Sequence, residues 1–166
     1  MPMKGLQPHV LEALESELAY IPGGRDLEGR PLIIVNVPAE LQPNTKTRLE
    51  CLIEYFLHIF SDETKQRGLG LIVDARRGAW RVARSCLRLA TTLMGSRAAL
   101  VIVVRPDGFW DKRVDNCTKS HKDGEPTYVT LERLSSYIDF AQLPYELEGN
   151  KSYDHAEWIK TRVVLA

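Results

Sequence analysis

The stretch that most constrains the fold of this chain runs from Gly68 to Met94 and reads GLGLIVDARRGAWRVARSCLRLATTLM. Its first part, Leu69–Asp74, is an apolar run rich in β-favouring residues that ends on a carboxylate, which predicts a buried strand. After a basic turn, apolar residues recur at helical spacing, which predicts a helix with one face in the core. A buried strand followed by such a helix is half of a βαβ unit.

The other face of the predicted helix carries a row of arginines. Steps of four, three and four residues return a helix to nearly the same angle. Four arginines therefore share one face: Arg77, Arg81, Arg84 and Arg88. No acidic residue stands among them, although a solvated helix usually mixes both signs. We expect either an anionic partner, such as a phosphoinositide headgroup, a membrane surface or an acidic protein face, or neutralisation by acids of neighbouring elements.

Strand and helix patterns alternate along the rest of the chain. Strands are predicted over Pro31–Val37, Leu69–Asp74, Ala98–Val104 and Thr127–Leu131. Helices are predicted over Leu6–Ile21, from Thr45 to about Phe60, after the turn that follows Asp74, over Glu132–Ile138 and over His155–Val164, with one or two helical turns over Phe109–Val114. The alternation predicts an α/β fold, a mostly parallel sheet of about four to five strands with helices on both faces.

Composition sets limits on the class of protein. A chain of 166 residues can bury a core without disulfides or a metal. Lys plus Arg and Asp plus Glu both number 22, so no net field favours nucleic-acid binding. Three widely spaced cysteines, Cys51, Cys86 and Cys117, indicate reduced thiols. No apolar run approaches the roughly 18 residues of a membrane span, and MPMKGLQPHV has no signal-peptide core. We expect a cytoplasmic location, with peripheral membrane contact at most.

Catalytic motifs are absent from the sequence. The turn Ala75–Gly78 lacks the glycines of a phosphate-binding loop, and no GK[ST] or GxSxG occurs. Neither Cys86 nor Cys117 has an arginine six positions later, as a thiol phosphatase requires. Asp74 and Asp107 follow strands, which makes a metal or acid/base pair conceivable, but an aspartate there more often caps a turn. We expect no catalytic residue, metal ion or cofactor.

Five segments, in order across nearly the whole chain, carry a resemblance to a known family. They are Gly23–Val35 (GGRDLEGRPLIIV), Arg67–Trp80, Ala99–Arg113 (ALVIVVRPDGFWDKR), Ile138–Gly149 (IDFAQLPYELEG) and Tyr153–Arg162. They resemble the CRAL-TRIO lipid-binding domains, most closely the subtype in Trio, Kalirin and related Dbl-family Rho exchange factors and in proteins that join this domain to spectrin repeats.

The resemblance implies a sheet with one face closed by a helical gate around a lipid such as phosphatidylinositol. It also implies a membrane-targeting or autoinhibitory role beside exchange-factor units. This chain departs from the lipid-transfer members in two places. One short helix, Leu6–Ile21, replaces their N-terminal bundle, and the gate is reduced to Phe109–Val114 and a polar loop. These departures favour surface recognition of headgroups or protein partners over bulk lipid transfer.

Together these observations predict a non-catalytic lipid- or phosphoinositide-binding regulatory module of a larger cytoplasmic signalling protein. The expected lipid- or anion-binding residues are Arg77, Arg81, Arg84, Arg88, Phe109 and Trp110. The two aromatic residues would close over an apolar group, or be plain core. The alternative is a protein-interaction or autoinhibitory module that binds no lipid and contacts other domains of its own chain or small GTPase signalling proteins. We expect residues 1–150 to form the domain, with a helix in 151–166 that ends the fold or leads into a spectrin-like region.

Overall fold

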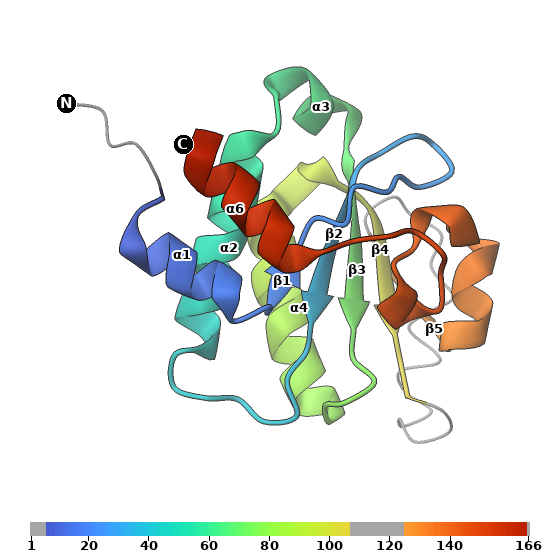
Figure 1. Cartoon of the computed structure of the whole chain (residues 1–166). Coiled ribbons are helices and arrows are strands. Elements are labelled where there is room, and N and C mark those ends of the chain that lie inside the picture. Colours follow the sequence, from blue (N-terminus) through green and yellow to red (C-terminus); the bar gives the residue numbers. More distant parts are fainter. Residues whose placement is uncertain (1–5, 107–124, 166) are drawn as a thin grey trace.

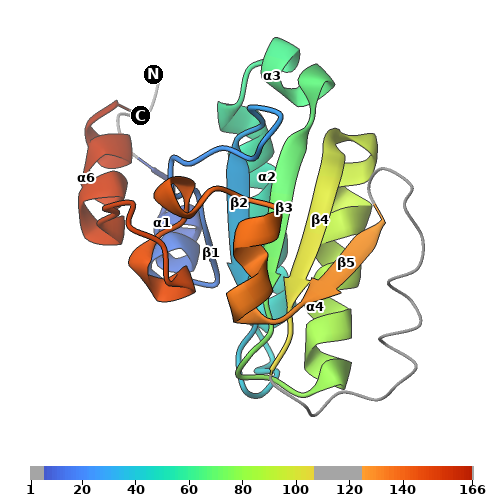
Figure 2. The same ribbon diagram turned by 90° about the vertical axis from the view of Figure 1, so that its right-hand side faces the viewer.

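The computed structural model describes residues 6–106 and 125–165 and shows an α/β fold built on one five-stranded sheet (Figures 1 and 2). The strands are β1 (Ala19–Tyr20), β2 (Leu32–Asn36), β3 (Leu69–Asp74), β4 (Ala98–Val104) and β5 (Pro126–Val129), and they lie in this order across the sheet. β2 to β5 are parallel, whereas β1 pairs antiparallel with β2. The predicted mostly parallel sheet is therefore confirmed.

Apart from α3 (Asp62–Arg67), which lies beyond the start of β3, the α-helices pack against one face of this sheet (Figures 1 and 2). They are α1 (Pro8–Glu15), α2 (Thr45–Ile59), α4 (Trp80–Met94) and α6 (His155–Leu165). α2 connects β2 to β3, and α4 connects β3 to β4. Because parallel crossovers are right-handed and the strand order runs in one direction, both connecting helices fall on the same side. Their apolar residues form the larger core, which includes the fully buried Phe56.

The second face of the sheet is covered by the C-terminal segment, residues 131–147. This segment consists of short 3₁₀ helices: η3 (Leu131–Ser136), η4 (Phe140–Gln142) and η5 (Tyr145–Leu147). Four buried residues of the segment join the sheet residues in a second core: Leu134, Ile138, Leu143 and Leu147. The short helix predicted over Glu132–Ile138 is present as the 3₁₀ helix η3, which ends two residues earlier.

The first helix is shorter than predicted. α1 ends at Glu15, and Glu17 adopts a left-handed backbone with φ 59°. The chain then forms β1, in which Ala19 and Tyr20 pair with β2. Leu18 and Ile21 extend the helical spacing of the sequence, but both lie outside the helix, because pairing with a distant strand overrides the local pattern.

The turn before β2 holds the C-terminal segment in place. Gly24 packs so closely on Gln142 that an added Cβ would lie 2.0 Å from its carbonyl oxygen. The backbone N–H of Arg25 also donates to Oε1 of Gln142 (2.9 Å). Asp26, 7% exposed, organises the turn by accepting from the backbone N–H (2.8 Å) and Nε (2.7 Å) of Arg30. Two of the segments that carry the family resemblance therefore meet in space.

Candidate functional site

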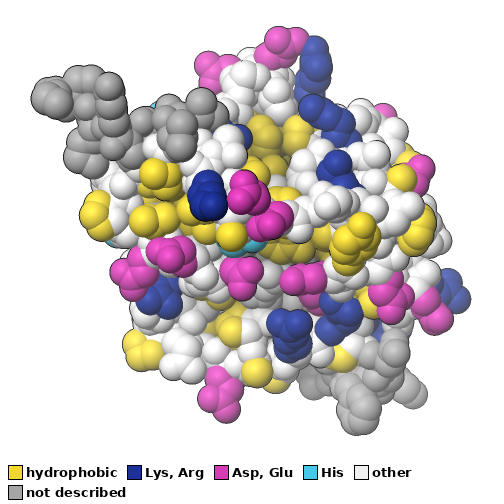
Figure 3. Space-filling model, viewed as in Figure 1, with side chains coloured by type: hydrophobic (Ala, Val, Ile, Leu, Met, Phe, Trp, Pro, Cys, Tyr) yellow, Lys and Arg dark blue, Asp and Glu magenta, His cyan; other side chains and the backbone are white. Residues whose placement is uncertain are grey.

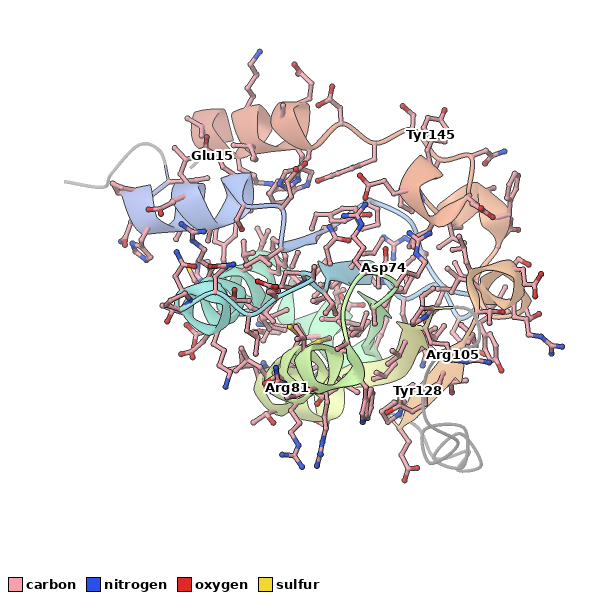
Figure 4. All side chains as sticks on the ribbon, turned by 90° about the horizontal axis from the view of Figure 1, so that it is seen from below. Glu15, Asp74, Arg81, Arg105, Tyr128 and Tyr145 are labelled. Carbon is pink, nitrogen blue, oxygen red and sulfur yellow. The ribbon has the colours of Figure 1, made fainter. Side chains whose placement is uncertain are left out.

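α4 has the two faces that the sequence predicts. Its inward residues are Val82, Ala83, Cys86, Leu87, Ala90 and Met94, all buried. Its arginines Arg81, Arg84 and Arg88 are exposed, as is Arg77 in the preceding turn. Arg81 lies on α4 away from Asp74 at the end of β3 (Figure 4). We call Arg77, Arg81, Arg84 and Arg88 the arginine face.

The arginine face has an unbalanced positive charge. Among residues 6–106 and 125–165, no carboxylate lies within 4.0 Å of any of its four guanidinium groups. The N-cap residue Ala79 offers no side-chain acceptor, so the positive end of the helix dipole is uncapped. By contrast, the face seen in Figure 3 intersperses acidic and basic side chains.

Arg76 does not belong to this face, because it is held by Asp74. Its Nε donates to Oδ1 (2.9 Å) and its Nη2 to Oδ2 (2.8 Å) of that carboxylate. Nη2 also donates to the backbone carbonyl of Glu146 (2.9 Å), which ties the end of β3 to η5. These hydrogen bonds to Asp74 raise the pKa of the Arg76 guanidinium. Asp74 therefore acts as a structural anchor, in agreement with the turn-capping interpretation.

Of the remaining candidates from the sequence, some lie in the described part of the chain and some lie outside it. In the described part of the chain, no three His, Cys, Asp or Glu side chains lie close enough to hold a metal ion. None of the described helices combines the length and apolarity needed to cross a bilayer. Asp107, Phe109, Trp110 and Cys117 lie outside the described residues, so the role expected of the two aromatic residues stays a prediction.

A cavity of about 800 Å³ opens at the carboxyl end of β2, a location the sequence did not indicate. Parallel α/β sheets commonly bind ligands at this end of the strands. Its walls come from the α1–β1 junction, the end of β2, η5 and the start of α6. Tyr20 and Tyr153 stack in its wall with ring centroids 5.1 Å apart. Burial raises the pKa of both phenols, so they remain protonated at neutral pH.

A histidine at this cavity ties α6 to α1. Nε2 of His155 lies 2.6 Å from the carbonyl oxygen of Leu14, and Nδ1 lies 2.6 Å from the Tyr153 hydroxyl. Trp158, one turn further on, packs edge-on against Phe56 of α2. Residue spacing predicts only a helix here, because the residues that line the cavity come from elements far apart in the chain. The aromatic cluster YDHAEW was the available signal.

Comparison with known proteins finds relatives that are much longer than this chain. No model of a known protein family matches it. It is 33% identical over 159 residues to the SEC14 domain and spectrin repeat-containing protein 1 of Mus musculus and of Homo sapiens. It is 31% identical over 165 residues to guanine nucleotide exchange factor DBS of Homo sapiens.

These alignments cover most of this chain but a small part of each relative. The match takes in 93% of the chain and 23% of the SEC14 and spectrin-repeat protein, and 94% of the chain and 14% of the exchange factor. The α/β fold with its mostly parallel sheet agrees with this match. The chain belongs to the CRAL-TRIO domains, of the subtype found in SEC14 and spectrin-repeat proteins and in Dbl-family exchange factors.

Proposed function

We propose that this domain is a non-catalytic regulatory module that binds anionic phospholipid headgroups, phosphoinositides above all, through the arginine face. The observation that carries the proposal is the absence of any carboxylate within 4.0 Å of these four arginines among the described residues. The domain would act within a larger cytoplasmic signalling protein, at the membrane periphery.

The energetics of the face support an anionic partner. Like charges three or four residues apart on a helix destabilise it by about 0.2–0.5 kcal/mol per pair. Within α4, Arg81 with Arg84 and Arg84 with Arg88 have these spacings. A phosphate group would relieve the repulsion, because a guanidinium donates two parallel hydrogen bonds to phosphate oxygens. Each basic residue near an anionic membrane surface adds about 1 kcal/mol of binding.

Surface binding is also more consistent with the packing than uptake of a whole lipid. The second face of the sheet already carries the buried apolar side chains of residues 131–147. Ile34 and Ile72, near the middle of that face, are fully buried. An acyl chain on this part of the sheet would have to displace the C-terminal segment.

Vesicle cosedimentation tests the proposal. We expect the chain to pellet with phosphatidylcholine vesicles that contain a phosphatidylinositol bisphosphate and to stay in solution with phosphatidylcholine alone. The double variant Arg81→Glu with Arg84→Glu should bind at least about thirtyfold more weakly, since two favourable contributions of about 1 kcal/mol are lost. Raising the salt concentration should weaken wild-type binding, because the contacts are exposed.

A matched control makes the same change of charge elsewhere. Arg133 in η3 and Lys160 in α6 are both exposed, and Arg133→Glu with Lys160→Glu should pellet like the wild type. Equal pelleting of the wild type and the Arg81→Glu, Arg84→Glu variant would reject the arginine face as the binding site.

A second candidate is a protein-interaction or autoinhibitory module that binds no lipid. The filled second face favours it, and an acidic protein surface would satisfy the arginine face equally well. Its partners would be other domains of the same protein or small GTPase signalling proteins, with α6 leading into a spectrin-like region. Failure of the wild-type chain to pellet with any anionic vesicle would favour this candidate.

A further inference from the structure

The cavity beside Tyr20 has the features of a second ligand site, which shares only Arg77 with the arginine face. Its volume of about 800 Å³ falls in the range of small-molecule sites, on the order of 300–1,000 Å³. Three acidic residues line it: Glu17, Glu146 and Asp154. Tyr145, 66% exposed, also lines it and lies on the far side of Asp74 from Arg81 (Figure 4).

Tyr20 provides an unused hydrogen-bonding group in the wall of this cavity. Its side chain is only 5% exposed, yet its hydroxyl has no hydrogen-bond partner among residues 6–106 and 125–165. Burial, together with the nearby charges of Glu146 and Asp74, raises the pKa of this phenol. The hydroxyl therefore stays neutral and can accept a hydrogen bond from a donor in the cavity. The hydroxyl oxygen itself is accessible from the cavity, so a donor on a ligand can reach it.

Two glutamates line the cavity together with Tyr20, and the backbone carbonyl of each accepts a hydrogen bond. The carbonyl of Glu17 accepts from Nδ2 of Asn36 (2.8 Å), and the carbonyl of Glu146 accepts from Arg76 (2.9 Å). Neither carboxylate has a cationic side chain within 4.0 Å in the described part of the chain. Burial and then the negative charges of Glu146 and Glu17 raise the pKa of the Tyr20 phenol.

The other ionisable groups that line the cavity are Asp154 and His155, which have hydrogen-bond partners, and Arg77, whose single positive charge is smaller than the total negative charge of the lining. Asp154 accepts the backbone N–H of Glu157 at the start of α6 (3.1 Å). Both ring nitrogens of His155 have partners. Arg77 adds one positive charge to the lining, against the carboxylates of Glu17, Glu146 and Asp154. The cavity therefore carries an excess of negative charge.

We propose that this cavity binds a guanidinium group, with the Tyr20 hydroxyl as a hydrogen-bond acceptor and the Glu17 and Glu146 carboxylates as its counter-charges. A guanidinium group suits this arrangement because its five donors lie in one plane and can bridge acceptors that a compact ammonium group would reach one at a time. The group could belong to a free small molecule or to an arginine side chain of a peptide, and the experiment separates these sources.

The test is a titration of the 166-residue chain, followed by the backbone ¹H–¹⁵N NMR signals of residues 17–20, 145 and 146. The probe is N-acetyl-arginine amide, and the matched control is N-acetyl-citrulline amide, which has nearly the same shape without the charge. We expect saturable shifts at these residues with the arginine compound alone. Glu17→Gln with Glu146→Gln should raise Kd at least about tenfold, and Tyr20→Phe about fivefold.

Two further arms complete the experiment. Glu15 on α1 (Figure 4) and Glu132 in η3 are exposed and lie outside the cavity lining, so Glu15→Gln with Glu132→Gln should leave Kd unchanged. A Gly/Ser heptapeptide with a central arginine that binds more tightly than the isolated compound identifies a peptide site, and equal Kd values identify a site for a small cation. Identical shifts with the arginine and citrulline compounds, or wild-type affinity in the carboxylate variant, would overturn the proposal.

Discussion

The hydroxyl of Tyr153 lies 2.6 Å from Nδ1 of His155, and the direction of this hydrogen bond follows from the other ring nitrogen. Nε2 of His155 is 2.6 Å from the carbonyl oxygen of Leu14, which can only accept. Nε2 therefore carries the hydrogen, and in the neutral ring Nδ1 accepts the hydroxyl hydrogen of Tyr153. The chain Tyr153–His155–Leu14 joins the start of α6 to α1 through one imidazole.

The first prediction concerns these two hydrogen bonds of His155. Tyr153→Phe keeps the stacking on Tyr20 but removes the donor to His155, so we expect the free energy of unfolding to fall by about 1 kcal/mol. Urea denaturation measures the change. Tyr137→Phe is the control, because Tyr137 is 38% exposed and makes no hydrogen bond through its hydroxyl in the described structure, and its effect should be within about 0.5 kcal/mol. Equal losses of unfolding free energy in the two variants would contradict a stabilising hydrogen bond from Tyr153 to His155.

The second prediction concerns alkaline pH. Burial raises the pKa of the Cys86 thiol from 9.0 to about 11. Because the folded state holds this proton more tightly than the unfolded state, the stabilisation is complete below pH 9.0 and is lost as pH rises toward about 11. The loss is on the order of 2 kcal/mol. Tyr20 and Tyr153, whose pKa values are also raised, add to the decline above pH 10.0.

Cys86→Ala separates the thiol from the two phenols. The variant should be less stable at neutral pH, because it leaves a small void, but its unfolding free energy should decline less steeply between pH 9 and about 11. Chemical denaturation at a series of pH values gives both slopes. The same slope in the variant and the wild type would show that Cys86 does not contribute to the alkaline decline.

The third prediction concerns the cover of the second face. Ile138 is fully buried, whereas Phe140, two residues later, is 50% exposed. Ile138→Ala should cost about 2–5 kcal/mol, because it leaves a cavity against the sheet. Phe140→Ala should cost less than about 1 kcal/mol. If residues 131–147 were only loosely attached, thermal unfolding would show similarly small effects of both substitutions.

The strand and helix in Gly68–Met94 were predictable because each has a strong local pattern. β3 is fully buried up to Asp74, so its whole run is apolar, and α4 has one apolar and one charged face. The first helix was predicted six residues too long at its C-terminal end, because Leu18 and Ile21 fit a helical period by chance. The conformation of this segment depends on Glu17 turning left-handed and on β1 pairing with β2.

The two candidate sites differ in how far the sequence could reveal them. The arginine face lies within one helix and its preceding turn, so the spacing of its residues predicts their common exposure. The cavity combines Glu17, Tyr20, Glu146 and His155, which approach one another only once α6 and η5 have packed. No spacing within a single segment records this approach. In the sequence, Tyr20, Tyr153 and His155 each look like an ordinary, partly packed side chain.

The cover of the second face has a consequence for how the chain is made. The apolar side chains of β2, β3 and β4 on that face are complete once Val104 has been synthesised, but their cover begins only at residue 131 and ends at residue 147. At typical translation rates, roughly 5–20 residues per second, Leu32 and Ile34 would wait on the order of ten seconds for these partners. A nascent chain at this stage exposes the apolar side chains of the sheet, and exposed apolar surface of this kind is what chaperones bind.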